Sequence, residues 1–485
     1  MKHYAHVTAD VDQSRGGRTT AAFFDFDGTL IAGFSVLSFL RQRVLSGDMP
    51  PREAITQLAA GWEYGLKLSD FPDIMAQTAA SLRGISDSLM VDTSEQVYKN
   101  DLSGNIYPES RALVEAHVAK GHTVVIVSSA TQYQVRHIAA ELGIKHVLCN
   151  HLEVENGALT GNLLPPLCYG KGKLEAARSF AEDNGINLGK SYFYTDGGED
   201  IPLLEDVGFP RPVNPDAELQ SKARREGWPV QSFASRGLPG FWDVARTGLV
   251  FGGFFGSFLA GLPGWFLNQS RRELINTAIP IWGDFGSGAA GLQVATEGEE
   301  HLWSDRPAVF VFNHQSATDA LILARLLRRN FSGVVKTEMQ SNPLVGTILG
   351  AVGTMFIDRG NHDQAIDALK PAVRRLKEGI SIAIAPEGQR SLGYKLGEFK
   401  MGAFHIAMQA GVPVIPIVIA NSSDSMPKTG AIIRPAKIDV KVLPPIATDN
   451  WTAATVHEHA DEIRRLFLKN LGQADKEEVK LRSVK

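Results

Sequence analysis

The stretch that decides the first fold is Ala-Ala-Phe-Phe-Asp-Phe-Asp-Gly-Thr-Leu, residues 21–30. Its four leading apolar residues predict a short buried strand, and Asp25 and Asp27 follow where that strand ends. Ligands of open α/β sheets bind at the carboxyl edge of the strands, so this position favours a site. Two such carboxylates can hold a Mg²⁺ ion, and one can attack phosphorus while the other protonates the leaving alcohol and later activates water.

Further apolar runs predict the rest of a first α/β domain over 21–235. Residues 123–127 and 192–194 are short apolar runs with polar residues directly after them. Helical patterns over 109–120 and 174–184 each end at a glycine, where a helix C-terminus is expected. This alternation predicts a parallel sheet wrapped by helices.

Two stretches of the first half fall outside this alternation. Residues 33–107 are mostly helical in pattern and contain no convincing strand, which predicts an inserted helical cap. Residues 1–20 have no apolar core and no small-residue cleavage site, so they do not resemble a secretory signal. We expect them to form a flexible N-terminal arm.

A second alternation of strands and helices begins near Arg306. Five apolar runs in it predict buried strands, at 308–312, 333–335, 354–357, 381–385 and 414–419. We therefore predict the class α/β with two domains, the second of which spans 286–485.

The composition agrees with two domains that fold in water. Of 485 residues, 44% are apolar and 21% are charged, which excludes a small stapled module, a disordered chain and a polytopic membrane protein. Cys149 and Cys168 are too few for a disulfide framework, which favours a reducing, intracellular compartment. The chain is net acidic before Ser235 and mildly basic after it, which is compatible with an anionic membrane surface or phosphate substrates. Nucleic acid binding would require a denser basic stripe.

Residues 247–270 lie in the expected linker, 236–285, and carry no charge. Their length would permit a bilayer span. Six glycines and Pro263 make the stretch a poor isolated helix, whereas its phenylalanines and Trp265 suit partial insertion. We expect a membrane-associating helical hairpin in one leaflet, and a buried helix between the domains is the alternative.

Four polar residues complete the first candidate site. Ser128, Asp196 and Asp200 follow the ends of predicted strands, and Lys173 opens a predicted helix. A hydroxyl and an ammonium can bind phosphate oxygens, and the carboxylates add hard ligands for Mg²⁺. Each residue alone could equally be part of a turn, a cap or a solvated helix, and Lys171 rivals Lys173. Their shared place after strands favours one site.

Over about residues 20–235 this arrangement resembles the haloacid dehalogenase superfamily, in particular its phosphoserine-phosphatase-like branch with a helical cap. The resemblance implies that Asp25 is the nucleophile, which forms an aspartyl-phosphate, and that Asp27 is the general acid/base. It also implies phosphate binding by Ser128 and Lys173. Mg²⁺ is the implied cofactor, with these metal residues: Asp25, Asp27 through its backbone carbonyl, Asp196 and Asp200.

One departure from that family bears on the substrate. Phosphoserine phosphatases carry a glutamate that recognises the substrate ammonium, and this chain has Phe34 at the aligned position. An amino-acid substrate would lack its partner there, and the apolar residues that follow suit a less polar leaving group. Apolar stripes on helices more commonly mean packing, so the cap core is the alternative explanation.

The second candidate site follows the strand predicted at 308–312. His314 and Asp319 meet if His314 lies in the loop and Asp319 in the first turn of a helix. The carboxylate would then orient the imidazole as a general base, which lets a substrate hydroxyl attack an acyl thioester directly. Ser316-x-x-Asp319 is also a helix-capping pattern, so capping is the alternative.

Two arginines, Arg359 and Arg390, lie in blocks beside predicted strands and suit bidentate phosphate binding. Four blocks, NHQSATD at 313–319, GTMFIDR at 353–359, PEGQRS at 386–391 and VPVIPI at 412–417, resemble the motifs of 1-acylglycerol-3-phosphate acyltransferases. The resemblance covers about 240–450 and implies His314 as base, Asp319 as its orienter and 412–417 in the acyl-binding region. It places the following residues at the lysolipid phosphate: Arg359, Glu387, Gly388 and Arg390. Gln389 stands where the family has threonine, which puts fine substrate specificity in doubt.

The whole layout resembles bacterial fusions of these two enzymes. We therefore expect a bifunctional enzyme of phospholipid biosynthesis, associated as a monotopic or peripheral protein with the cytoplasmic side of the membrane. The second domain would convert lysophosphatidate to phosphatidate with acyl-CoA or acyl-carrier protein as donor. The first would dephosphorylate lysophosphatidate or phosphatidate, with a small phosphomonoester such as phosphoserine, or a non-catalytic scaffold, as alternatives. No nucleic acid partner is expected, and a homo-oligomer is left open.

Overall fold

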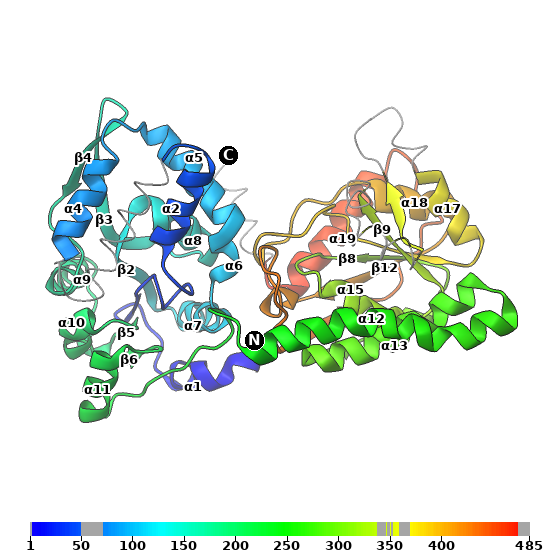
Figure 1. Cartoon of the computed structure of the whole chain (residues 1–485), viewed down its shortest axis with the longest axis horizontal. Coiled ribbons are helices and arrows are strands. Elements are labelled where there is room, and N and C mark those ends of the chain that lie inside the picture. The colour runs from blue at the N-terminus through cyan, green and yellow to red at the C-terminus, as the bar shows by residue number, and fades with distance from the viewer. Residues whose placement is uncertain are drawn as a thin grey trace. The chain divides into compact units, whose positions relative to one another are not determined.

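A computed structural model describes residues 2–49, 71–336, 346, 350, 353–357 and 369–473 of the chain. The chain divides into two compact units, Met1–Leu238 and Pro239–Lys485. Each unit is a β-sheet covered by helices (Figure 1). The prediction of a two-domain α/β protein is therefore confirmed.

The first unit is built on a six-stranded sheet of order β4-β3-β2-β1-β5-β6. The strands are β1 (Ala21–Phe24), β2 (Thr123–Thr131), β3 (His146–Glu155), β4 (Ala158–Leu164), β5 (Tyr192–Thr195) and β6 (Phe209–Pro212). Neighbours pair in parallel except β3 and β4, which are antiparallel. Phe24 is in register with Ile126 of β2 and Tyr194 of β5, so these three strands end at the same edge.

The central strand β1 is buried on both faces. Ala22 and Phe24 belong to the core on one side of the sheet, and Ala21 and Phe23 to the core on the other. An uninterrupted apolar run is what a central parallel strand requires, which is why the sequence revealed it. The covering helices are α7 (Pro108–Ala119), α8 (Gln132–Leu142), α9 (Lys171–Asp183), α10 (Ile201–Asp206) and α11 (Ala217–Glu226).

A helical cap follows β1, and its described residues form no strand. Its helices are α2 (Ser35–Leu45), α4 (Phe71–Ser81), α5 (Asp87–Val97), η2 (Tyr98–Leu102) and α6 (Ser103–Asn105). Helix α4 lies beside β4, where a Cβ added to Gly161 would be 3.4 Å from Cα of Ala80 (Figure 1). The β3–β4 hairpin, which the sequence analysis missed, thus supports the cap.

The expectation of a flexible arm at residues 1–20 is wrong. Residues 5–13 form helix α1 (Ala5–Gln13), and Val7 and Val11 are buried in the core of the first unit. Asp10 Oδ2 is 2.7 Å from a guanidinium nitrogen of Arg211, which fixes the helix to β6. Two apolar residues one turn apart were sufficient to dock a short, mostly polar helix.

The second unit is built on a seven-stranded mixed sheet of order β10-β9-β11-β8-β12-β13-β7. Its strands are β7 (Leu292–Glu297), β8 (Val309–Phe312), β9 (Phe331–Lys336), β10 (Met355–Ile357), β11 (Ser381–Ile384), β12 (Val414–Ile419) and β13 (Ala436–Val442). Among these described strands only β12 and β13 pair antiparallel. The five strands expected from apolar runs are present, whereas β7 and β13 were missed because exposed polar residues alternate along them.

Two long helices form a hairpin in the second unit: α12 (Phe241–Asn268) and α13 (Arg271–Ala290). Residues 247–270 were expected to contain the whole hairpin, but they supply only most of its first arm and the turn. Gln269 adopts a left-handed conformation, and Ser270 caps α13 by accepting a hydrogen bond from Glu273 N–H. The remaining helices of the unit are α14 (His301–Ser304), α15 (Asp319–Leu327), α17 (Lys370–Lys377), α18 (Gly402–Ala410) and α19 (Val456–Asn470).

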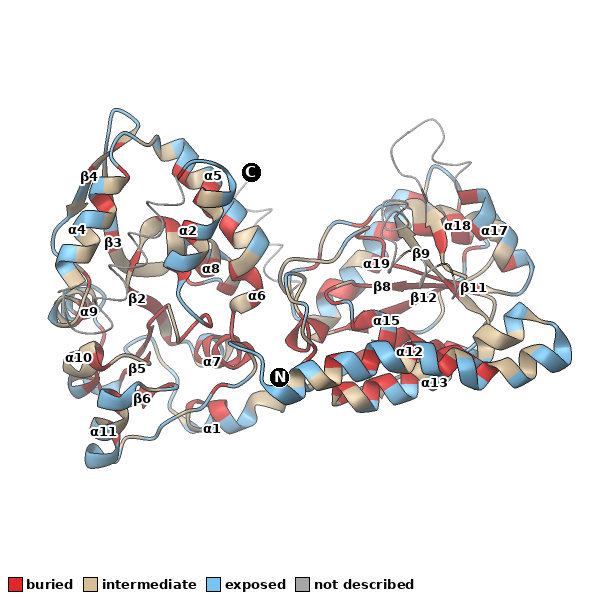
Figure 2. Ribbon diagram, viewed as in Figure 1, coloured by how far each residue is buried: buried red, intermediate tan, exposed pale blue. Residues whose placement is uncertain are grey.

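Helix α12 is largely exposed. Among the described residues it alone is long and apolar enough to cross a membrane by length and composition, and only 22% of its most apolar window is buried. Figure 2 shows pale exposed segments along α12 beside the buried strands of the same unit. Val250 and Phe254 face Trp282 of α13, whose indole N–H donates to the Val250 carbonyl (3.1 Å). Within its own unit, α12 thus packs against α13 and leaves most of its apolar window uncovered.

Helix α13 is held tightly against α15 by glycines. A Cβ added to Gly283 would lie 2.5 Å from the backbone nitrogen of Arg325, and one at Gly286 would lie 2.6 Å from a methyl carbon of Leu321. The contact at Gly283 is with backbone, which cannot move aside as a side chain can. The hairpin is thereby docked on the helix that begins at Asp319.

Replacing Gly283 by Val is expected to destabilise the second unit by about 1–3 kcal/mol, because an overpacked contact forces the two helices apart. Differential scanning calorimetry of the full chain would show a lower Tm for one of its transitions. Gly288→Ala is the matched control on the same helix. That position is exposed with no atom within 4 Å of an added Cβ, so alanine should be neutral or stabilising by up to about 1 kcal/mol. Equal Tm values for Gly283→Val and wild type would contradict this packing.

Candidate active sites

Asp25 lies at the carboxyl edge of the first sheet with a buried cation beside it. Its backbone N–H donates to the Tyr194 carbonyl (2.9 Å), and its Oδ1 is 3.0 Å from Lys173 Nζ. Burial raises the pKa of Asp25 to about 6, although Lys173 opposes this. Burial alone would lower the pKa of Lys173, but the Asp200 and Asp25 carboxylates raise it above its usual value. The structure thus brings Lys173, and not the exposed Lys171, to Asp25 as a permanent cation for phosphate oxygens.

Asp27 is held by the first residue of α2. Ser35 donates its backbone N–H to Oδ1 (2.7 Å) and its hydroxyl to Oδ2 (3.0 Å), and Gln134 of α8 donates to the Ser35 hydroxyl oxygen (2.8 Å). Burial raises the pKa of Asp27 to about 7, and the bonds from Ser35 only partly offset this. A carboxyl group that exchanges a proton near neutral pH suits general acid/base chemistry. The sequence analysis missed Ser35 and Gln134, since no local motif marks them.

Asp196 follows β5 and lies close to the motif after β1. Thr29 donates to its Oδ1 (3.2 Å), and a Cβ at Gly28 would lie 2.0 Å from its Oδ2. Gly28 also has a φ of 72°, so both the turn and the close approach require glycine. Burial raises the pKa of Asp196 to about 8, and the nearby charge of Asp25 adds to this.

These carboxylates fit a hard divalent cation. Asp25 and Asp196 repel each other in a buried place, and no described cation pairs with Asp196. Two carboxylates and the Asp27 carbonyl are oxygen donors of the kind that Mg²⁺ binds. Within the described parts of the chain, no three His, Cys, Asp or Glu side chains group as a metal site, so such an ion would depend on this carbonyl and on water or substrate oxygens.

Asp200 and Ser128 complete the first site in different ways. Asp200 Oδ2 is 2.8 Å from Lys173 Nζ and accepts a hydrogen bond from Thr195 (2.6 Å), so this oxygen holds Lys173. The buried Oδ1 has no hydrogen-bond partner among the described residues and is available to a metal ion. Ser128 is buried in β2, and its oxygen accepts the Ala130 N–H (3.1 Å). Among described residues no acceptor takes the Ser128 hydroxyl proton, which can therefore be donated to a phosphate.

Phe34 is exposed beside this site. It precedes Ser35 at the start of α2 and is 63% exposed. Val36 and Leu37 are also exposed, at 40% and 47%. The cap-core explanation is therefore correct for Phe39 and Leu40, which are buried, and wrong for Phe34 and the two residues after Ser35. The exposed apolar side chains flank the residue that holds Asp27.

His314 and Asp319 are in contact at the carboxyl edge of the second sheet. His314 Nδ1 is 2.7 Å from Asp319 Oδ2, and Asp319 is the first residue of α15 and fully buried. The same oxygen accepts the backbone N–H groups of Gln315 (2.9 Å) and Ser316 (3.0 Å). Asp319 is thus placed to orient the imidazole. Ser316 does not cap α15, since the N-cap is Thr318 and makes no side-chain cap hydrogen bond. No described residue hydrogen-bonds Nε2 of His314, which is left to meet a substrate hydroxyl.

The PEGQRS loop after β11 reaches the same site. Burial lowers the pKa of Arg390, and the charge of the Asp319 carboxylate partly offsets this. Gly388 has a φ of 79°, a conformation that favours glycine. Glu387 is buried and accepts the backbone N–H of His314 (2.8 Å). Arg359 lies outside the described residues.

The sequence analysis also missed Asn313. Its side-chain amide donates to the Ile419 carbonyl and accepts the Ile419 N–H, both at 2.8 Å. This pair of bonds joins the end of β8 to the end of β12, so His314 leaves the sheet at a fixed point. Asn313 is the first residue of the NHQSATD block, and its place in that motif was the signal that could have identified it from the sequence.

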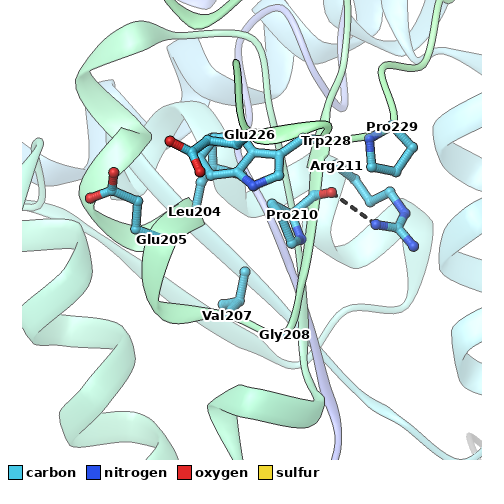
Figure 3. A pocket seen from close by; sticks show the side chains of 9 residues that line it. All are labelled: Leu204, Glu205, Val207, Gly208, Pro210, Arg211, Glu226, Trp228 and Pro229. Atoms are coloured by element: carbon cyan, nitrogen blue, oxygen red, sulfur yellow. Dashed lines mark hydrogen bonds between the residues drawn. The ribbon is translucent and has the colours of Figure 1, made fainter. Parts of the chain in front are cut away.

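A pocket of about 420 Å³ in the first unit contains none of these residues (Figure 3). Trp228, Glu205 and Glu226 are among the side chains that line it, and it lies at the start of β6 rather than at the strand ends. Lys222 Nζ is 2.6 Å from Glu205 and 2.9 Å from Glu226, so both carboxylates are already paired. The pocket has no part in the chemistry of the two sites.

Both halves match known families. The haloacid dehalogenase-like hydrolases match residues 22–205, and a family described as Acyltransferase matches residues 293–420. The chain is 32% identical over 266 residues to the inhibition of morphological differentiation protein of Streptomyces azureus, covering 53% of this chain and 95% of that one. It is 33% identical over 187 residues to 1-acyl-sn-glycerol-3-phosphate acyltransferase of Limnanthes douglasii, covering 38% of this chain and 66% of that one.

Among solved structures, the 1-acyl-sn-glycerophosphate acyltransferase PlsC of Thermotoga maritima is 23% identical, with a TM-score of 0.39, and the match covers 47% of this chain and 97% of that one. The fold and the two carboxyl-edge sites define a two-domain α/β enzyme. The chain belongs to the haloacid dehalogenase-like hydrolases through its first unit and carries an acyltransferase domain in its second.

Proposed function

We propose that the second unit transfers an acyl group from a thioester to the free hydroxyl of lysophosphatidate and so forms phosphatidate. The contact between His314 Nδ1 and Asp319 Oδ2 carries this proposal, since it fixes a proton on Nδ1 and leaves Nε2 as the acceptor. Nε2 takes the hydroxyl proton as the oxygen attacks the thioester carbonyl. The thiolate then leaves and receives that proton from the imidazolium. Arg390 binds the lysolipid phosphate.

Mass spectrometry of lipid products tests this function. The purified full-length protein is given lysophosphatidate with acyl-CoA or with acyl-carrier protein, which also distinguishes the two donors. The expected product is phosphatidate. Glycerol 3-phosphate and lysophospholipids other than lysophosphatidate serve as acceptor controls. If one of these were acylated and no phosphatidate formed, the proposed acceptor would be contradicted.

For the first unit we propose phosphomonoester hydrolysis in two steps. Asp25 attacks phosphorus while Lys173 and Ser128 hold phosphate oxygens, and Asp27 gives its proton to the leaving alcohol as the phosphorus–oxygen bond breaks. Asp27 then takes a proton from water, which hydrolyses the aspartyl-phosphate and releases phosphate. A Mg²⁺ ion held by Asp25, Asp196 and the Asp27 carbonyl would neutralise charge between carboxylate and phosphate.

The proposed substrate of this hydrolysis is a lipid phosphate, lysophosphatidate or phosphatidate. Phe34, Val36 and Leu37 support this, because they expose apolar surface next to Ser35 and hence next to the acid/base Asp27. A leaving alcohol that carries an acyl chain can cover that surface, whereas the ammonium of phosphoserine would meet no carboxylate at Phe34.

We further propose that the α12–α13 hairpin inserts shallowly into one leaflet on the cytoplasmic side. Phe251, Phe255, Leu259, Phe266 and Leu267 are each at least half exposed along α12, and arginines follow at its turn. Burial of such side chains in the acyl region stabilises association. Substrate and product lipids then need not leave the membrane.

A double substitution, Phe255→Glu with Leu259→Glu, is expected to reduce sedimentation with phosphatidylglycerol vesicles by at least about tenfold, because two carboxylates would have to enter the acyl region. Leu45→Glu is the control: Leu45 is 70% exposed but belongs to the first unit. It should leave sedimentation unchanged. Undiminished sedimentation of the double variant would contradict docking through α12.

A further inference from the structure

The carboxylate of Glu387 is directed entirely at the protein around it. Its Oε1 accepts the backbone N–H of His314 at 2.8 Å. Its Oε2 accepts the hydroxyl of Ser391 at 2.8 Å and the backbone N–H of Gly397 at 2.9 Å. A Cβ at Gly397 would lie 2.9 Å from the same oxygen, so this part of the loop is fitted closely to the carboxylate.

Such a carboxylate is a poor partner for a phosphate group. It carries negative charge and only accepts hydrogen bonds, so it repels a phosphate dianion. Arg390 in the same loop has the opposite properties, and no described residue takes a hydrogen bond from its guanidinium. The resemblance to acyltransferases places both residues at the lysolipid phosphate, whereas the geometry assigns them different tasks.

The peptide of His314 is held from both sides by the PEGQRS loop. Its N–H donates to Glu387, and its carbonyl accepts the backbone N–H of Ser391 at 2.8 Å and the Ser391 hydroxyl at 3.3 Å. Asp319 orients the ring through Nδ1 and also accepts the backbone N–H of Gln315 at 2.9 Å. The peptide after His314 is therefore held by both Ser391 and Asp319, whereas the N–H of His314 is held by Glu387.

We propose that Glu387 is a positioning residue that fixes the backbone of His314, so that Nε2 reaches the acceptor hydroxyl, and that it does not contact the lysolipid phosphate. The inference rests on the proposed acyl transfer by His314. A general base must lie within hydrogen-bond reach of the proton it removes, so a small displacement of His314 slows turnover. Binding of the phosphate by Arg390 is left intact.

The test compares full-length Glu387→Gln with wild type. Glutamine keeps the shape of the side chain, but its NH₂ group must face either the N–H of His314 or the donors of Ser391 and Gly397. The expected result is a fall in kcat of about 10- to 100-fold, while KM for lysophosphatidate changes by less than about threefold. Hydrogen–deuterium exchange at the His314 amide should become faster. Arg390→Gln is the contrasting variant and should raise KM without changing that exchange.

Ser391→Ala keeps the Glu387 carboxylate and removes one of its hydrogen-bond donors. It should lower kcat by a smaller factor and leave KM unchanged. This variant keeps the proposal testable if Glu387→Gln folds poorly. A raised KM with normal kcat and unchanged amide exchange in Glu387→Gln would overturn the positioning role and place Glu387 at the substrate. A wild-type protein that forms no phosphatidate would instead contradict the proposed function. In that case exchange at the His314 amide still decides whether Glu387 holds the backbone.

Discussion

Full-length protein with His314→Ala is expected to lose acyl transfer to lysophosphatidate by about 10²- to 10⁴-fold, the range that general-base catalysis contributes. Alanine removes Nε2, the atom that accepts the hydroxyl proton. It keeps the backbone N–H and carbonyl that Glu387 and Ser391 bind, so the surrounding loop should stay folded. The rate is measured as phosphatidate formed per unit time by mass spectrometry.

Two further variants make the His314 result specific. Asp319→Asn should also lower the rate strongly, because an amide can present N–H to Nδ1 and so favour the wrong tautomer. His301→Ala is the matched control, since His301 lies in α14 and its described ion-pair partner is the exposed Glu300. It should be fully active. Acyl transfer retained in His314→Ala would defeat the assignment of the base.

The second large effect is expected at Asp25. Asp25→Asn should lower phosphate release by roughly 10⁴-fold or more, because an amide oxygen is a very poor nucleophile towards phosphorus. The substitution keeps the size of the side chain beside Lys173, and acyl transfer in the second unit should not change. Phosphate release is measured on lysophosphatidate, phosphatidate and phosphoserine with Mg²⁺ supplied.

The same assay separates the hypotheses for the first unit. Asp206→Asn, which removes an exposed pair with Arg178 far from the strand ends, is the control and should retain activity. Robust turnover of phosphoserine with none of either lipid would contradict the lipid substrate. A wild-type protein inactive on every phosphomonoester would contradict hydrolysis and favour the scaffold. If Asp25→Asn released phosphate as fast as wild type, another group would have to be the nucleophile.

Prediction from sequence was most successful for central strands and for the residues directly after them. Strands β1 and β8 are buried on both faces, so burial requires an apolar run that is visible without knowledge of the fold. Strands β7 and β13 have alternating burial, and helix α1 docks through two valines. Their sequences carry weak signals because half or more of their side chains face solvent.

The sequence by itself determined the two-domain α/β class and the identity of the polar groups at the two sheet edges. Those groups could be named because strand ends are local features: Asp25 and Asp196 each follow one directly, and His314 lies two residues after one. The tertiary structure alone decided how these groups are held. Ser35 holds Asp27, Asp200 holds Lys173, and Glu387 holds the backbone of His314. Each of these contacts joins different elements of the fold, so the partner of a catalytic group is set by packing and not by any pattern along the chain.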